Sequence, residues 1–145
     1  MTPRMLDERL SVLPQIQPED LPTLAAMGFR SIISNRPDGE APDQPATAEI
    51  ASAARAAGLQ FEHVPVVGGA ISDADIARFG TLLDTLPGPV LGFCKTGTRA
   101  ATLWALSQAR QQPVAQLLQA AAQAGYDLSG QAERMAKLAA PDKAG

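Results

Sequence analysis

The sequence predicts a single α/β domain, residues 1–145, with a mainly parallel central sheet flanked by helices. Short runs rich in β-branched and apolar residues alternate with longer alanine-rich stretches, the pattern of parallel strands joined by helical crossovers. The chain has 145 residues, which suffices for one domain with a sizeable core, and neither an internal repeat nor a linker divides it.

Four short runs are expected to form the strands. The third ends at paired glycines, and the fourth is apolar throughout, as expected of a strand that is buried on both faces. Turn residues, Asn35 to Gly39, close the second run. The predicted strands are Leu10–Leu13, Ser31–Ser34, 59–67 and Val90–Phe93.

Helices are expected between and after these strands. Ser72 can cap the third helix, with Asp73 and Asp75 in its first turn, where the helix dipole favours carboxylates. The fourth is so broadly apolar that it must lie in the core, and the tail 141–145 is expected to fray. The predicted helices are 18–27, 45–57, 73–86, 98–110, 114–124 and 129–139.

Charge and composition exclude several function classes. The formal net charge of −3 and a pI of about 5.0 give no support for a nucleic-acid or membrane partner. A single cysteine cannot form an intramolecular disulfide, and residues 1–10 lack the apolar run of a signal peptide, so we expect a cytoplasmic location. His63 is the only histidine, and the pattern predicts neither a metal site nor a cofactor.

The one cysteine, Cys94, lies between a predicted buried strand and a predicted helix. Its loop reads Cys-Lys-Thr-Gly-Thr-Arg, and the backbone N–H groups of Lys95, Thr96, Gly97 and Thr98 can curl into an anion-binding nest. The helix dipole would favour the thiolate there, and the guanidinium of Arg99 suits an oxyanion. An unpaired cysteine is more often a small buried hydrophobe, but this context favours a nucleophile.

A second group of polar residues follows the second predicted strand. In open α/β sheets ligands bind beyond the carboxyl ends of the strands, so Asn35, Arg36 and Asp38 are candidate accessory residues beside Cys94. Arg36 could equally be a solvated turn residue. His63 is expected to be structural, because no second ligand or base partner can be named for it.

Three segments of the chain resemble a known family. They read "LSVLPQIQPEDLPTLAAMGFRSIISNRPDGE", "FEHVPVVGGAISDADI" and "GPVLGFCKTGTRAATLWAL", and they resemble the phosphatase-like domain of the beta-lactamase-hydrolase-like proteins. The resemblance is strongest over residues 5–110, with C-terminal helices in 111–140. The family is similar in fold to dual-specificity phosphatases, and some members fuse this domain to a metallo-β-lactamase-like domain that oxidises persulfides.

The resemblance implies roles for the loop residues. Cys94 would be the nucleophile, Lys95 to Thr98 the anion-binding backbone and Arg99 the anion clamp. It also implies a cysteine-phosphatase-like fold, a small anionic substrate and a persulfide-oxidising partner enzyme.

The loop departs from the signature of cysteine phosphatases, which place a histidine before the cysteine, five residues between cysteine and arginine, and serine or threonine after. Here Phe93 precedes Cys94, four residues separate Cys94 from Arg99, and Ala100 follows. The shorter loop resembles the C-R-x-G-x-R loop of rhodanese-type sulfurtransferases, with lysine in place of the first arginine.

The general acid of such phosphatases also lacks a counterpart. Gly68, Gly69 and Ala70 occupy the loop where those enzymes carry an aspartate, which protonates the alkoxide leaving group. Sulfur transfer between thiolates needs no strong acid. The carboxylates that could substitute are Asp38, Glu40, Asp73 and Asp75.

We therefore expect a cysteine-dependent group-transfer enzyme. The favoured chemistry is a sulfurtransferase acting on thiosulfate or a persulfide, and the alternative is a phosphomonoester hydrolase. A non-enzymatic anion-binding module is a third class.

Overall fold

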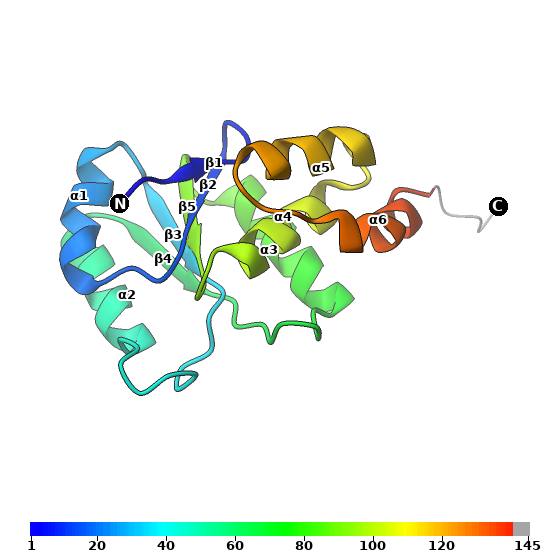
Figure 1. Ribbon diagram of the computed structural model, residues 1–145. Coiled ribbons are helices and arrows are strands. Elements are labelled where there is room, and N and C mark those ends of the chain that lie inside the picture. Colours follow the sequence, from blue (N-terminus) through cyan, green and yellow to red (C-terminus); the bar gives the residue numbers. More distant parts are fainter. Residues whose placement is uncertain (141–145) are drawn as a thin grey trace.

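The computed structural model describes residues 1–140, and the predicted frayed tail 141–145 lies outside the described residues. The strands are β1 (Arg4–Met5), β2 (Leu10–Leu13), β3 (Ser31–Ser34), β4 (Gln60–His63) and β5 (Val90–Phe93). They form one sheet in the order β1-β2-β5-β3-β4, in which only β1 runs antiparallel to its neighbour (Figure 1). The predicted fold class is confirmed.

Two layers of helices cover the sheet, α1 and α2 on one face and α3 to α6 on the other (Figure 1). Two of the helical segments begin as short 3-10 turns, η1 and η2. The helices are η1 (Pro18–Asp20), α1 (Leu21–Ala26), α2 (Thr47–Ala56), α3 (Asp73–Thr85), α4 (Thr98–Gln108), α5 (Val114–Gln123), η2 (Ser129–Gln131) and α6 (Ala132–Ala139).

The predicted elements differ from the observed ones mainly at their ends. Strand β1 was not predicted, because two residues are too few to show an alternating pattern. The third predicted strand, 59–67, is ordered as a strand only to His63, since its neighbour β3 ends at the paired residue Ser34. The first predicted helix divides into η1 and α1, with a proline in the first turn of each.

Helix α4 is the central helix, as its composition predicts. Ala100, Leu103 and Trp104 are fully buried, and the indole Nε1 of Trp104 donates a hydrogen bond of 2.8 Å to Asp7 in the β1–β2 turn. This packing fixes the start of α4 at the carboxyl end of β5.

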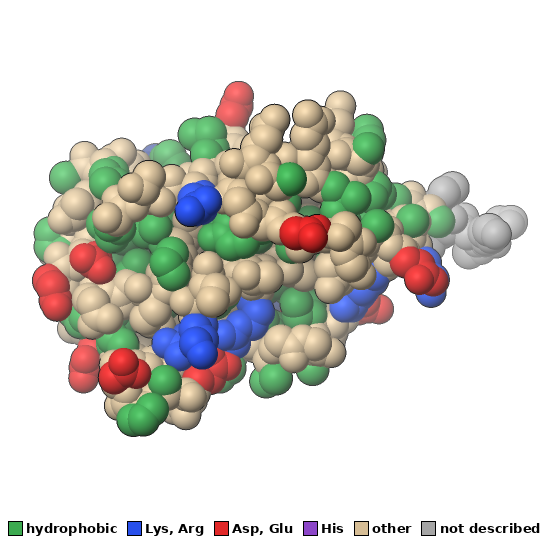
Figure 2. Space-filling model, viewed as in Figure 1, with side chains coloured by type: hydrophobic (Ala, Val, Ile, Leu, Met, Phe, Trp, Pro, Cys, Tyr) green, Lys and Arg blue, Asp and Glu red, His purple; other side chains and the backbone are tan. Residues whose placement is uncertain are grey.

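The carboxyl ends of β3 and β5 lie side by side. Ser34 pairs with Phe93 in the parallel register, so Asn35 and Cys94 leave the sheet at the same edge, as predicted. Figure 2 shows Lys and Arg side chains gathered below the centre of this face, in the region where the β5–α4 loop runs in Figure 1. None of the helices in residues 1–140 has the length and hydropathy needed to cross a membrane.

Candidate active site

Cys94 lies at the base of the β5–α4 loop and is fully buried. Its Sγ accepts a hydrogen bond of 3.1 Å from the backbone N–H of Gly97. Gly97 has φ 94° and caps α4, which is the left-handed turn that an anion-binding nest requires. The sulfur is therefore enclosed, and a polar N–H group of the predicted loop points at it.

Tyr126 packs against the same loop from the segment after α5. Its hydroxyl donates a hydrogen bond of 3.3 Å to the backbone oxygen of Thr96. A Cβ atom on Gly97 would collide with the hydroxyl of Tyr126. Backbone conformation and space thus both require glycine at this position. Tyr126 was not foreseen as a loop contact from the sequence.

The guanidinium of Arg99 is held at the site and is not directed into solvent. Nη1 donates to the backbone oxygen of Val66 at 2.9 Å and to Glu40 Oε2 at 2.7 Å, and Nη2 donates to Glu40 Oε1 at 2.9 Å. Three of the five guanidinium N–H groups are used in these bonds. The Nε–H and one Nη2–H lie outside them. Hydrogen bonding to Glu40 raises the pKa of Arg99, and the nearby Cys94 sulfur adds to this effect.

Glu40 lies between two arginines. Arg36 is only 5% exposed, and it donates from Nε to Glu40 Oε1 at 2.9 Å and from Nη1 to Gln15 Oε1 at 3.0 Å. The hydrogen bond from Arg99, followed by that from Arg36, lowers the pKa of Glu40 to about 2. Glu40 is thus ionised at neutral pH and holds no proton to donate. Arg36 is a buried member of this cluster and not a solvated turn residue.

Asn35 connects the strand ends to Arg99. Its backbone N–H donates to the oxygen of Phe93 at 2.9 Å, and its Nδ2 donates to the oxygen of Val64 at 2.9 Å. The N–H of Val66 donates to the oxygen of Asn35 at 3.1 Å. Because the oxygen of Val66 accepts from Arg99, Asn35 fixes the segment that supports the guanidinium.

The remaining carboxylates bond elsewhere. Asp38 accepts from the N–H of Thr47 at 2.7 Å and from its hydroxyl at 2.9 Å, and these bonds lower the pKa of Asp38. Asp38 thus stabilises the start of α2. Asp75 closes a capping box at the start of α3, as its spacing predicts, and Asp73 pairs with Arg134 at 3.1 Å. None of them is bonded to the Cys94 loop.

His63 supports the β3–α2 loop. Its Nε2 lies 2.8 Å from the backbone oxygen of Arg36. In residues 1–140 no group of three or more histidine, cysteine, aspartate and glutamate side chains is arranged to hold a metal ion.

Most of the chain matches one known protein family. Residues 3–111 match the family described as "Beta-lactamase hydrolase-like protein, phosphatase-like domain". The chain belongs to this family. It is 46% identical over 104 residues to a beta-lactamase hydrolase-like protein of Agrobacterium fabrum, and this alignment covers 72% of the chain and 24% of the relative. The phosphatase-like domain thus spans about a quarter of the curated relatives it matches.

Solved structures support the same assignment. A Neisseria meningitidis Z2491 protein (nma1982) is 36% identical, with a TM-score of 0.84, covering 92% of this chain and 96% of that one. The core catalytic domain of the PP-IP phosphatase SIW14 of S. cerevisiae is 12% identical with a TM-score of 0.70, over 97% and 86% of the two chains, and shows the fold alone. The predicted family and cysteine-phosphatase-like fold are confirmed. The phosphatase-like domain is an enzyme of the phosphatase-like superfamily.

Proposed function

We propose that this phosphatase-like domain is a sulfurtransferase. The Cys94 thiolate attacks the outer sulfur of thiosulfate, the S–S bond of the donor breaks, and its electron pair leaves with sulfite. Cys94 then carries a persulfide, which passes its outer sulfur to a thiol acceptor. A persulfide donor would react in the same way and leave as a thiolate.

The position of Glu40 carries this proposal. Phosphate ester cleavage needs a proton for the alkoxide that leaves, whereas sulfite and thiolates leave without a strong acid. Glu40 is the carboxylate paired with Arg99, and two guanidinium groups keep it ionised. Asp38 and Asp75 are committed to helix ends. These contacts of Glu40, Asp38 and Asp75 favour a reaction that needs no acid.

The loop can stabilise the anions of this reaction. The N–H of Gly97 points at Sγ of Cys94, and the two N–H groups of Arg99 that bond neither Glu40 nor Val66 can donate to sulfite or to a persulfide. Lys95 is exposed in the same loop and adds positive potential that attracts a small anion. Asn35 and Arg36 position the clamp, through Val66 and Glu40 respectively.

Phosphomonoester hydrolysis is the second candidate, and membership of a phosphatase-like family favours it. Cys94 would attack phosphorus, the oxygens of the phosphoryl group would rest on the loop N–H groups and Arg99, and water would release phosphate. The four-residue spacing from Cys94 to Arg99 is one residue shorter than in the cysteine phosphatases, which favours the sulfur chemistry.

Parallel turnover of thiosulfate with cyanide and of an aryl phosphate separates these functions. We expect thiosulfate turnover in the wild type, the mass of one added sulfur atom on the peptide that contains Cys94, and no turnover in Cys94→Ser. Turnover of the phosphate ester alone would refute the sulfurtransferase. If Cys94→Ser still binds anions and the wild type turns over neither substrate, the domain is a binding module.

A persulfide-oxidising enzyme is the partner that fits this product. The curated relatives are about four times as long as the matched segment, so they have room for further domains that could consume a persulfide.

A further inference from the structure

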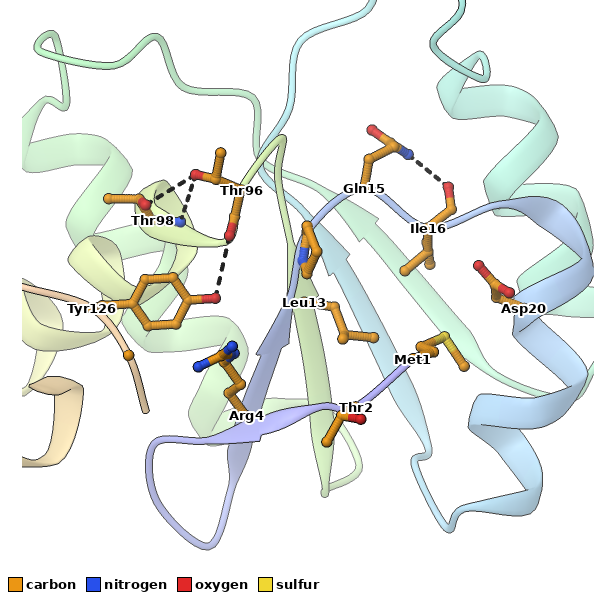
Figure 3. A pocket seen from close by; sticks show the side chains of 12 residues that line it. Met1, Thr2, Arg4, Leu13, Gln15, Ile16, Asp20, Thr96, Thr98 and Tyr126 are labelled. Carbon is orange, nitrogen blue, oxygen red and sulfur yellow. Dashed lines mark hydrogen bonds between the residues drawn. The ribbon is translucent and has the colours of Figure 1, made fainter. Parts of the chain in front are cut away.

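A pocket of about 620 Å³ adjoins the Cys94 loop. It reaches the loop at Thr96 and Thr98, and it is also lined by Leu13, the last residue of β2, and by Ile16 in the segment that follows (Figure 3). Strand β1 and the segment after α5 provide the other walls. A volume of this size suits a small organic molecule, and an inorganic ion would leave most of it empty.

The pocket wall and the loop form one packed unit. Tyr126 lines the pocket and donates to the backbone of Thr96 at 3.3 Å, while its hydroxyl covers Gly97. Burial raises the pKa of Tyr126, while Arg4 opposes this rise and Cys94 adds to it, so Tyr126 lies within electrostatic range of both groups. A molecule in this pocket therefore lies beside the backbone that encloses the sulfur.

Arg4 gives the pocket a cation. One N–H group of its guanidinium donates to the backbone oxygen of Ala124 at 2.9 Å, and the other four lie outside this bond. No carboxylate within residues 1–140 forms an ion pair with Arg4. Figure 3 shows Arg4 and Tyr126 on one side of the pocket and Asp20 on the other. A carboxylate is the group that an exposed, unpaired guanidinium binds best.

We propose that this pocket binds the acceptor of sulfur transfer, a small thiol that carries a carboxylate. The carboxylate pairs with Arg4, the carbon chain lies on Leu13 and Ile16, and the sulfur extends past Thr96 toward Cys94. This assignment rests on the proposed sulfurtransferase function.

The transfer step balances without an added oxidant. The acceptor thiolate forms a bond to the outer sulfur of the Cys94 persulfide, and the bond between the two persulfide sulfurs breaks. Its electron pair returns to Sγ of Cys94, which is again a thiolate. The acceptor leaves as a persulfide whose outer sulfur keeps the protonation state it had on Cys94, so the transfer neither consumes nor releases a proton.

Acceptor kinetics test the pocket. Thiosulfate is the donor, and kcat/KM is measured for 3-mercaptopropionate and for 2-mercaptoethanol, which lacks the carboxylate. The ratio of the two values should fall about tenfold or more in Arg4→Gln, because a hydrogen-bonded charge pair is lost. Arg4→Lys should recover part of this ratio. Arg55→Gln is the matched control, since it removes an exposed arginine on α2. Because the same two thiols are compared in every variant, the difference in their intrinsic reactivity does not affect the change in the ratio.

Two results would overturn the assignment. The first is a ratio that is unchanged in a folded Arg4→Gln variant. The second, measured in the wild type alone, is equal inhibition of 3-mercaptopropionate turnover by propionate and by propanol, since only propionate should compete. If thiosulfate fails to load Cys94 at all, the proposed function and the acceptor site both fall. Loading with an unchanged ratio removes only the acceptor site.

Discussion

Replacing Glu40 with glutamine removes the negative charge between Arg36 and Arg99. Arg36 is 5% exposed, so the variant leaves a buried guanidinium without the carboxylate charge that pairs with it. An uncompensated buried charge destabilises the folded state. We therefore expect Glu40→Gln to lower the free energy of unfolding at neutral pH.

The size of the loss follows from the pKa of Glu40. A fall from 4.5 to about 2 corresponds to about 3 kcal/mol. The Glu40 side chain is 27% exposed and the residue lies in an exposed loop, so solvent screening reduces the expected loss to about 1–2 kcal/mol. Because the pKa is lower in the folded state, this stabilisation is complete above pH 4.5 and is lost as the pH falls toward 2.

Urea unfolding of the wild type and Glu40→Gln at about pH 7, 5 and 3 measures this contribution. The difference in free energy should be equal at the two higher values and should shrink at the lowest. Glu8→Gln, which removes an exposed carboxylate elsewhere, is the control and should change stability little. A difference that is absent at neutral pH, or that persists undiminished in acid, would refute the reasoning.

Three further variants test the site. Gly97→Ala should lower the free energy of unfolding by about 2 kcal/mol or more, because of the φ of 94° and the collision with Tyr126, and thermal unfolding measures it; unchanged stability would contradict the packing described. Arg99→Lys keeps the positive charge but loses the pair of hydrogen bonds to Glu40, so kcat/KM for thiosulfate should fall about tenfold or more. An unchanged kcat/KM in this variant would show that the guanidinium geometry is dispensable. Arg36→Gln should raise the pKa of Glu40 from about 2 toward 4.5 in an NMR titration of the carboxyl group, and a fixed midpoint would exclude coupling between the two.

The interior strands could be predicted because their burial leaves a pattern in the sequence. Val90–Phe93 and Ser31–Ser34 are buried along their whole lengths, and the predicted and observed ends agree. Arg4–Met5 is an exposed edge strand of two residues, and nothing in its composition distinguishes it from a loop. Helix ends shifted by a few residues because several helices begin or end in turns whose hydrogen bonds the sequence does not specify.

The candidate site was predictable only where it is local. Cys94 and Arg99 share one loop, so their spacing and the glycine between them are visible in the sequence. Glu40 and Arg99 are 59 residues apart, and the ion pair between them leaves no periodicity. Sequence reasoning therefore considered Glu40 only as a candidate acid, whereas its contacts keep it ionised and bound to the clamp. The role of Asn35 in supporting Arg99 through Val66 likewise depends on strand order.

The tyrosine that covers the loop lies outside the segment shared with the family. The match ends at residue 111, and Tyr126 comes from the chain beyond it. A chain that ended at residue 111 would keep every residue of the Cys94 loop and would lose the Tyr126 ring, which packs against Gly97. The shape of the Cys94 loop therefore depends on a residue that lies beyond the segment matched to the family.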